Sequence, residues 1–341
     1  MRAALESRLN QIWYRQEPPP WFLRMLVPLY RLVYSFDQKR HLKNRASDLE
    51  AKCIIVVGNL TVGGSGKTPL LIHLCELFKA AGFSPAVISR GYGRKDSHQR
   101  VVGPDSDPEL VGDEPLLIAR RCGVPVVVGS SRIKSARLLF AKGFDLVLSD
   151  DGLQHRRLPR AIEICVVDGQ RGFGNGLMLP AGPLREDLSR LETVDHVVIN
   201  GSEPADAKQP GLPDGIQSIR MDIHATKVYS IGENLSWRLS QFSGCRVSAV
   251  AGISNPDRFF SLLRQARIEV TEHVFPDHHE FGQEDFEKLP DDLPVIMTEK
   301  DAVKCMKLKL KNAWYVSIEA HLPSEWEERL IREARGIVHE S

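Results

Sequence analysis

The chain has 341 residues, which is enough for two domains of ordinary size, and its 42% apolar and 26% charged residues are typical of a soluble globular protein. A formal net charge of +1 gives no argument for nucleic-acid binding. The six cysteines are scattered without a C-x-x-C pair, which argues against a disulfide framework or a zinc site and favours free thiols in a reducing compartment.

The first distinctive segment is the apolar run WFLRMLVPLYRLVYSF at residues 21–36. It is 16 residues long and contains Arg24 and Arg31, whereas a membrane-spanning helix needs about 20 mostly apolar residues. Residues 1–52 hold ten Lys and Arg against five Asp and Glu. We therefore expect an amphipathic helix. It fits equally well a segment on an anionic membrane surface and a helix packed on the protein's own core.

Short apolar segments alternate with helical ones over the next part of the chain. CIIVVGN is expected to form a buried parallel strand, and KTPLLIHLCELFKAAG a helix that ends at Gly82. Further strands are expected in SPAVIS, VPVVVG, FDLVLSD, IEICVVD and DHVVIN, with helices after GDEP and in SRIKSARLLFAKG. This alternation predicts a doubly wound, mostly parallel sheet.

The pattern breaks and then restarts in the second half of the chain. Residues 201–216 are rich in Pro, Gly and Asp and are expected to be a loop, and QSIRMDIHATKVYSI is expected to form two short strands of a connecting ribbon. The strand RVSAVAGI, a helix capped by Asn255, and the segments LPVIMTEKDAVK and AWYVSI then predict a second, smaller α/β domain. The expected divisions are a helical segment at 1–52, a first domain at 53–215, a ribbon at 216–240 and a second domain at 241–341.

The loop after the first strand, in VVGNLTVGGSGKTPL, is similar to a phosphate-binding loop. Backbone N–H groups in such a loop converge on phosphate oxygens; Lys67 would reach the β- and γ-phosphates, and the Thr68 hydroxyl would bind Mg²⁺. Thr61 replaces the first glycine of G-x-x-x-x-G-K-[ST], so the loop is divergent, and a turn without a ligand is the weaker alternative. The expected nucleotide contacts are Thr61, Val62, Gly63, Gly64, Ser65, Gly66, Lys67 and Thr68. The loop alone does not distinguish GTPases, ATPases and kinases.

Two acidic residues follow the expected strand FDLVLSD. A carboxylate of Asp150 or Asp151 at the carboxyl end of a strand could bind Mg²⁺ directly or through water. Adjacent side chains on an extended chain point different ways, so we expect one of the two to face the metal. A polar turn is the alternative, and the polar Gln154 and His155 that follow favour a functional site.

Two further segments carry acid–base residues. In VGDEP, Asp113 could accept a proton from an attacking hydroxyl, although the same residues also suit a helix start. FPDHHEF places Asp277, His278 and His279 together. A metal site fits these two adjacent histidines poorly, and a histidine that orients a carboxylate or binds a substrate phosphate is as plausible.

The segment MTEKDAVK, residues 297–304, differs from the guanine-binding motif N-K-x-D because Lys300 and Asp301 are adjacent. This counts against a GTPase. A P-loop GTPase or ATPase that loads a metal or moves a partner is still an alternative to a kinase, with residues 277–279 as a metal relay. A third interpretation is a soluble small-molecule kinase, in which residues 21–36 only pack.

Eight motifs occur in a specific order over about residues 53–304, namely GNLTVGGSGKTP, SRGYGR, VGDEP, DDGLQHRRL, DGQRGFGNG, LPAGPLRE, FPDHHEF and TEKDAVK. In this order they resemble the tetraacyldisaccharide 4'-kinase family, the lipid A 4'-kinases. The family's own phosphate loop also carries Thr at the position of Thr61. The resemblance implies a P-loop kinase domain joined by a short two-stranded linker to a smaller α/β domain.

The resemblance also implies an activity. The γ-phosphoryl group of ATP would pass to the 4'-hydroxyl of a tetraacylated glucosamine disaccharide 1-phosphate, which gives the 1,4'-bisphosphate, lipid IVA. ATP and Mg²⁺ would be the cofactors, and the glycolipid rather than a nucleic acid would be the partner. The N-terminal segment would hold the enzyme on the cytoplasmic face of the inner membrane, as a peripheral or monotopic protein.

Roles for individual residues follow from the same resemblance. Asp113 and His278 would pair as a catalytic dyad, with Lys67 as the phosphate-binding lysine. The expected Mg²⁺ ligands are Thr68 with Glu114, Asp150 or Asp151, and the resemblance does not order these three carboxylates. Weaker candidates for contact with the substrate phosphate are Arg90, Arg94, Arg185 and His279.

Overall fold

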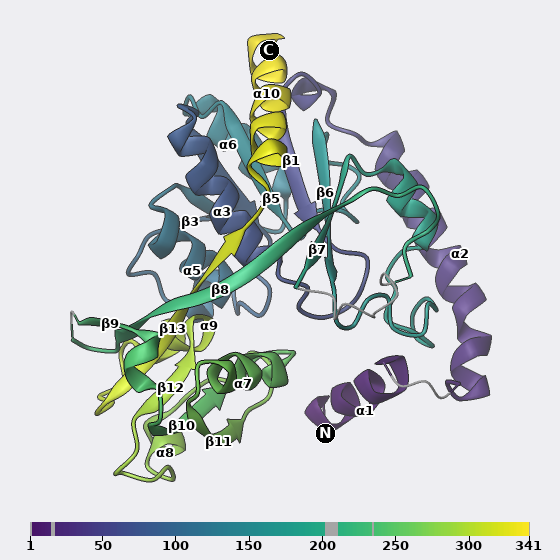
Figure 1. Ribbon diagram of the computed structural model, residues 1–341. Coiled ribbons are helices and arrows are strands. Elements are labelled where there is room, and N and C mark those ends of the chain that lie inside the picture. The colour runs from purple at the N-terminus through teal and green to yellow at the C-terminus, as the bar shows by residue number, and fades with distance from the viewer. Residues whose placement is uncertain (1, 15–17, 202–210, 234, 341) are drawn as a thin grey trace.

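The computed structural model describes residues 2–14, 18–201, 211–233 and 235–340 of the chain. It has two α/β domains joined by one long strand, with two helices at the N-terminus along one side (Figure 1). One path of hydrogen-bonded strands runs through both domains in the order β11-β10-β12-β13-β8-β7-β6-β1-β5-β2-β4-β3. Most of the loop expected at 201–216 lies outside the described residues.

The first domain is built on a sheet whose strands are β1 (Cys53–Gly58), β2 (Pro85–Ser89), β3 (Arg100–Val102), β4 (Val126–Val128), β5 (Leu146–Asp150), β6 (Ile162–Asp168) and β7 (His196–Asn200). Its neighbouring strands are parallel except for β3, which is antiparallel to β4. The expected mostly parallel sheet is thus confirmed. The edge strand β3 was not predicted, because it is three residues long and two of them are exposed.

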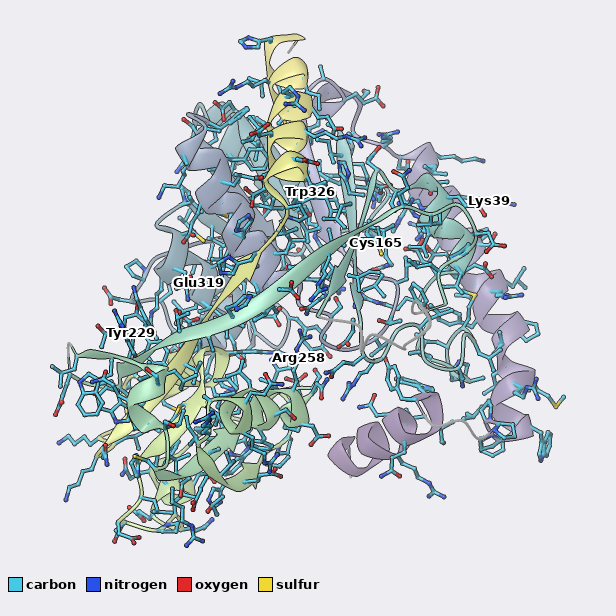
Figure 2. All side chains as sticks on the ribbon, viewed as in Figure 1. Lys39, Cys165, Tyr229, Arg258, Glu319 and Trp326 are labelled. Atoms are coloured by element: carbon cyan, nitrogen blue, oxygen red, sulfur yellow. The ribbon has the colours of Figure 1, made fainter. Side chains whose placement is uncertain are left out.

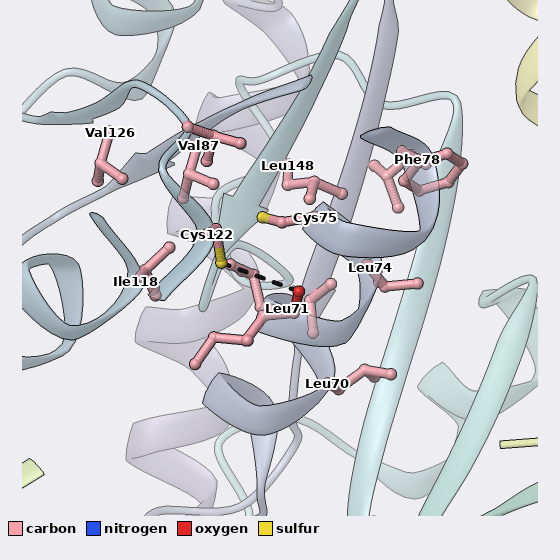
Figure 3. Packing of buried hydrophobic residues seen from close by; sticks show 14 of the residues in the cluster. Leu70, Leu71, Leu74, Cys75, Phe78, Val87, Ile118, Cys122, Val126 and Leu148 are labelled. Atoms are coloured by element: carbon pink, nitrogen blue, oxygen red, sulfur yellow. Dashed lines mark hydrogen bonds between the residues drawn. The ribbon is translucent and has the colours of Figure 1, made fainter. Parts of the chain in front are cut away.

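Helices cover both faces of this sheet. They are α3 (Lys67–Ala80), α4 (Pro108–Val111), α5 (Asp113–Cys122) and α6 (Arg132–Ala141), with 3₁₀-helices η1 (Ser47–Leu49) and η2 (Leu188–Thr193). On β1, Ile55 and Val57 face the core under α3 and α5, whereas Ile54 and Val56 face the core on the α6 side. Because both faces are buried, the strand is apolar throughout rather than alternating. Figure 3 shows α3 packed over the first of these cores.

The strand β8 (Ser218–Ser230) connects the two domains. Its first residues pair in parallel with β7, and from Asp222 it pairs antiparallel with β13 (Ala313–His321). The two short strands expected here are therefore one strand, and the ribbon is formed by β8 with a strand from the end of the chain. The segment contains no Gly or Pro to break it, so it continues while its partner changes. The short β9 (Ser236–Arg238) also pairs with β8.

The second domain contains β10 (Arg246–Ala251), β11 (Glu269–Val274), β12 (Val295–Thr298), α7 (Pro256–Gln265), α8 (Gln283–Phe286), α9 (Glu299–Cys305) and the 3₁₀-helix η3 (Leu239–Phe242). Strands β11, β10, β12 and β13 are parallel neighbours in that order. Asn255 precedes α7 as expected, but its side chain makes no capping hydrogen bond.

The last helix, α10 (Ser324–Glu340), packs on the first domain although the chain reaches it from the second. Trp326, Leu330 and Ala334 lie in the same core as α3, and Figure 2 labels Trp326 beside the first domain. Trp326 Nε1 donates to His196 Nδ1 at 3.3 Å. The expected domain at 241–341 is thus incorrect for this helix, because β13 runs antiparallel to β8 and carries the chain back toward β7.

The N-terminal helices are α1 (Arg2–Tyr14) and α2 (Trp21–Lys43). One side of α2 packs on the α6-side core through Val27 and Tyr30, and the Tyr30 hydroxyl donates to Arg185 O at 3.1 Å. The rest of the helix exposes an apolar stripe made of Trp21, Phe22, Met25, Leu26, Leu29, Leu32, Val33 and Phe36. Within the described residues, no helix combines the length and apolarity needed to cross a bilayer.

Candidate active site

The phosphate loop lies between β1 and α3, as the sequence predicts. Gly66 precedes the helix with a φ of +93°, and a Cβ built there would lie 1.9 Å from Asn200 Nδ2. Only glycine fits this position, because both the left-handed backbone and the close approach exclude a side chain. Asn200 donates in turn to Ser65 O at 2.9 Å, which fixes the loop against the end of β7.

Part of the expected nucleotide-binding loop is exposed, although the Val62 N–H donates to Pro183 O at 2.9 Å and Thr61 and Ser65 are buried. Val62, Gly63 and Gly64 are exposed, and the loop continues into Lys67 and Thr68 in the first turn of α3. The positive end of the helix dipole therefore lies directly behind the loop.

Lys67 is oriented by polar groups at the ends of the neighbouring strands. Its Nζ donates to Asn59 Oδ1 at 3.1 Å and lies 3.6 Å from Asp151 Oδ1. Arg185 donates to Asp151 Oδ2 at 3.0 Å and to Thr61 O at 3.1 Å, and it also bonds Asn59. The structure thus uses Arg185, a candidate for substrate contact, to hold the loop and Asp151. Asn59 was missed, since a single buried Asn after a strand is not a distinctive signal.

The adjacent carboxylates Asp150 and Asp151 differ in electrostatic environment. Although burial raises the pKa of Asp151, Lys67 and Arg185 outweigh it and hold that pKa below its ordinary value. Burial raises the pKa of Asp150 to about 6, with repulsion from Glu114 and Asp151 added. Asp150 Oδ2 accepts from Ser89 Oγ at 2.9 Å, while its Oδ1 is buried and lacks a partner among the described residues.

These environments test which carboxylate suits Mg²⁺. No group of three or more His, Cys, Asp and Glu forms a metal cluster in the described part of the chain. Mg²⁺ in nucleotide sites nevertheless needs only one or two protein ligands besides phosphates and water. Asp150 has an unpartnered buried oxygen, whereas both oxygens of Asp151 contact cations. The residues present therefore fit Mg²⁺ on Asp150, with Glu114 and Thr68 as the further candidates.

The raised pKa of Asp150 predicts a pH-dependent stability. Between about pH 4 and about pH 6 the folded protein holds a proton on Asp150 that the unfolded chain has released. The free energy of unfolding therefore falls as the pH rises through this window. Asp150→Asn removes the charge. At pH 8 without nucleotide or metal, we therefore expect the free energy of unfolding of this variant to exceed that of the wild type by about 1–3 kcal/mol.

At pH 4 this difference between the Asp150→Asn variant and the wild type should vanish. Urea unfolding with EDTA at both pH values measures it, with the exposed Asp105→Asn as the control. If the free energies of unfolding of Asp150→Asn and the wild type differ by the same amount at both pH values, the raised pKa of Asp150 is contradicted.

Asp113 and His278 meet across the interface between the two domains. Asp113 is the first residue of α5, and His278 lies in the loop after β11 with a φ of +61°. His278 Nδ1 is 3.1 Å from Asp113 Oδ2 although the two residues are 165 positions apart. Glu114 and Lys67 both act on the pKa of Asp150, so the start of α5 and the phosphate loop converge at this carboxylate.

Lys300 was not expected in the site, yet it lies within it. Its Nζ is 3.2 Å from Glu114 Oε1 and 3.3 Å from Asp277 Oδ1. A lysine two residues into a short helix is usually a solvated charge, so the local pattern gave no signal for this position.

The remaining substrate candidates lie outside this cluster of contacts. His279 pairs with Asp285 at 2.9 Å, and Arg94 donates to the carbonyl oxygens of Ser97 and His98. Arg90 is exposed after β2.

Arg258 of α7, in the second domain, contacts the ends of β6 and β7 in the first domain. Its Nη2 donates to Asn200 Oδ1 at 2.6 Å, and its Nη1 is 3.9 Å from Asp168 Oδ2. Figure 2 shows Arg258 between α7 and the first domain. Since Asn200 also bonds Ser65 O, the position of the second domain is linked to the loop.

The fold and the site together define a P-loop protein of the kinase type, in which an aspartate of one domain contacts a histidine of the other. A family model described as Tetraacyldisaccharide-1-P 4'-kinase matches residues 19–335. The chain belongs to this family, as the order of its motifs predicted.

Relatives with the same name support the assignment over nearly the whole chain. The Tetraacyldisaccharide 4'-kinase of Colwellia psychrerythraea is 43% identical over 322 residues, which cover 92% of each protein. That of Xylella fastidiosa strain M23 is 44% identical over 320 residues, 93% of each. A crystal structure of LpxK from Aquifex aeolicus, described as an "apo" form in complex with ATP, matches with a TM-score of 0.74 and 26% identity. It covers 92% of this chain and 99% of that one.

Proposed function

We propose that this protein transfers the γ-phosphoryl group of ATP to the 4'-hydroxyl of a tetraacyldisaccharide 1-phosphate and so forms the 1,4'-bisphosphate. The observation that carries this proposal is the contact of Asp113 with His278 beside the phosphate loop. A hydrolase needs only a water position next to the nucleotide. A base held between two domains suits a kinase that must receive a second, larger substrate.

The chemistry assigned to these residues is an in-line transfer. Asp113 Oδ2 contacts His278, which leaves Oδ1 to accept the proton of the acceptor hydroxyl. The acceptor oxygen forms a bond to the γ-phosphorus as the bond to the bridging oxygen breaks, and ADP leaves. Lys67 offsets charge on the transferring group. Asp150, with Thr68 and Glu114, would hold Mg²⁺, which would supply further charge neutralisation.

The lipid nature of the acceptor suggests a role for α2. Its apolar stripe is exposed, with Trp21 at 73% and Phe36 at 72%, and its last turn carries Arg40 and Lys43. Apolar and basic groups on one exposed helix are typical of binding to an anionic bilayer surface. We infer that α2 packs on the protein with one side and enters the cytoplasmic face of the inner membrane with the other, as a peripheral contact.

Replacement of Leu29, Leu32 and Phe36 together by Ser is expected to weaken binding to anionic vesicles by roughly 10- to 100-fold. Each such side chain contributes about 1.5 kcal/mol or more when fully buried, and only part of that is realised at an interface. The KM for the lipid acceptor should rise while kcat with a detergent-solubilised acceptor stays unchanged. Vesicle co-sedimentation measures the binding.

The matched control for this α2 variant is Val274→Ser, an exposed apolar residue of the second domain that should not affect vesicle binding. Unaltered vesicle binding by the triple variant would contradict the inference that α2 contacts the membrane.

Thin-layer chromatography with radiolabelled ATP and the tetraacylated disaccharide 1-phosphate tests the proposed reaction directly. We expect label to move to the lipid, with ATP preferred over GTP. A nucleotide hydrolysis rate that does not depend on added lipid and is higher with GTP would instead support the GTPase or ATPase alternative. Transfer to a small soluble acceptor with no dependence on α2 would support the small-molecule kinase.

A further inference from the structure

Lys300 is the centre of a charged cluster between the two domains. Besides Glu114 and Asp277, its Nζ lies 3.5 Å from His278 Nε2, and only 17% of its side chain is exposed. Burial lowers the pKa of Lys300, but Glu114 and Asp277 outweigh it and raise that pKa above its ordinary value. With a carboxylate oxygen of Asp277 at 3.3 Å from Nζ, Lys300 is an ammonium group, as lysines ordinarily are near neutral pH.

The position of α9, which carries Lys300, is fixed against α5 by a second ion pair. Glu299 accepts from Arg121 at 2.9 Å, and Arg121 also bonds Ser317 of β13. Lys300 contacts the first turn of α5 through Glu114, while Glu299 contacts its last turn through Arg121. These two pairs hold the lysine in place relative to the Asp113–His278 contact.

The chemistry of an ammonium group restricts the proton on His278. Lysine Nζ has three donors and no acceptor, so toward His278 it can only donate. Nε2 must then carry the lone pair, and the proton of the neutral ring lies on Nδ1. Nδ1 is the nitrogen that faces Asp113 Oδ2 at 3.1 Å.

The other tautomer has no suitable partner. An N–H at Nε2 would point toward the Lys300 ammonium, and the nearest carboxylate oxygen, Asp277 Oδ1, is 3.8 Å away. That oxygen already accepts from Lys300, and Asp277 Oδ2 accepts from the Ser254 hydroxyl.

We propose that Lys300 is a positioning residue that, together with the acceptor-only carboxylate of Asp113, fixes the Nδ1–H tautomer of His278. The imidazole then donates to Asp113 and orients it toward the acceptor hydroxyl. The proposal rests on the proposed role of Asp113 as the base. It gives the TEKD segment a function in the reaction, and it predicts that the charge of the lysine matters more than its packing.

Nitrogen NMR of the full-length protein labelled with ¹⁵N-histidine tests the proposal, since two-bond ¹H–¹⁵N correlations distinguish the two tautomers. The His278 signals are identified by their loss in His278→Asn. We expect Nδ1–H in the wild type at pH 8. In Lys300→Met only the Asp113 carboxylate still favours Nδ1–H. Part of the population should therefore shift to Nε2–H, and kcat should fall by about 10- to 100-fold, part of the general-base contribution. The KM for ATP should change less than twofold.

Lys300→Arg is the conservative variant and should keep the Nδ1–H tautomer, because a guanidinium also only donates. Lys307→Met, an exposed lysine of the same domain, is the matched control and should change neither the tautomer nor kcat. A structural role alone would lower stability and rate without moving the tautomer signal.

An Nε2–H signal in the wild type would overturn the proposal, and so would an unchanged tautomer in folded Lys300→Met. If Lys300→Met does not fold, the wild type and Lys300→Arg still test the proposal, because an Nε2–H signal in either protein would overturn it. A wild-type protein with the Nδ1–H signal but no transfer of phosphate to lipid would instead refute the proposed function.

Discussion

Asp113→Asn is expected to lower kcat by about 10²- to 10⁴-fold while the Kd for ATP changes less than twofold. The asparagine carbonyl can still accept from His278 Nδ1–H, so the contact between the domains persists. The variant lacks a basic oxygen to take the proton of the acceptor hydroxyl, which is the contribution of a general base. Steady-state rates at saturating lipid and calorimetric titration of ATP measure the two quantities.

Asp105→Asn, in the exposed segment before α4, is the matched control and should leave both quantities unchanged. Combining Asp113→Asn with His278→Asn should cost little more than Asp113→Asn alone, because the two residues act as one unit. Turnover of Asp113→Asn near the wild-type rate would contradict the assignment of Asp113 as the general base.

Local sequence patterns predicted the elements that are buried on both faces. The run CIIVV is apolar at every position because alternate residues of β1 enter different cores. The same local pattern could not show that β8 changes partner at Asp222, since the pairing depends on where β7 and β13 lie. Nor could it show that α10 returns to the first domain, because amphipathic helices give no indication of which core they cover.

The site residues likewise include some that local sequence predicts and some that it does not. The phosphate loop is contiguous, so its glycines, lysine and flanking elements could be predicted from spacing. Asp113 and His278 were paired only through the family resemblance, because 165 positions and two domains separate them. Lys300 and Asn59 were missed because single polar residues gain a role only from their neighbours in space. His279 adjoins His278 in sequence but pairs with Asp285 instead of Asp113.

Lys67→Met is expected to lower kcat by about 10²- to 10³-fold, because a fixed positive charge is lost where negative charge develops in the transition state. The ground-state affinity for ATP should fall less, since the backbone N–H groups of the loop remain. The fold should persist, because Asp151 keeps both hydrogen bonds to Arg185 at 3.0 and 3.1 Å. Rates at saturating ATP, with Tm measured in parallel, separate these effects.

The exposed Lys142→Met, beyond the end of α6, is the control for the removal of a lysine charge, and we expect it to behave as the wild type. A kcat loss in Lys67→Met that is matched by a loss of folded protein would mean that Lys67 mainly stabilises Asp151. A loss confined to the KM for ATP would mean that it binds the ground state and the transition state equally. Only a loss in kcat at full folding assigns Lys67 to the transferring phosphoryl group. That outcome would also separate the role of Lys67 from that of Arg185, which contacts the same carboxylate and donates to Thr61 O of the loop.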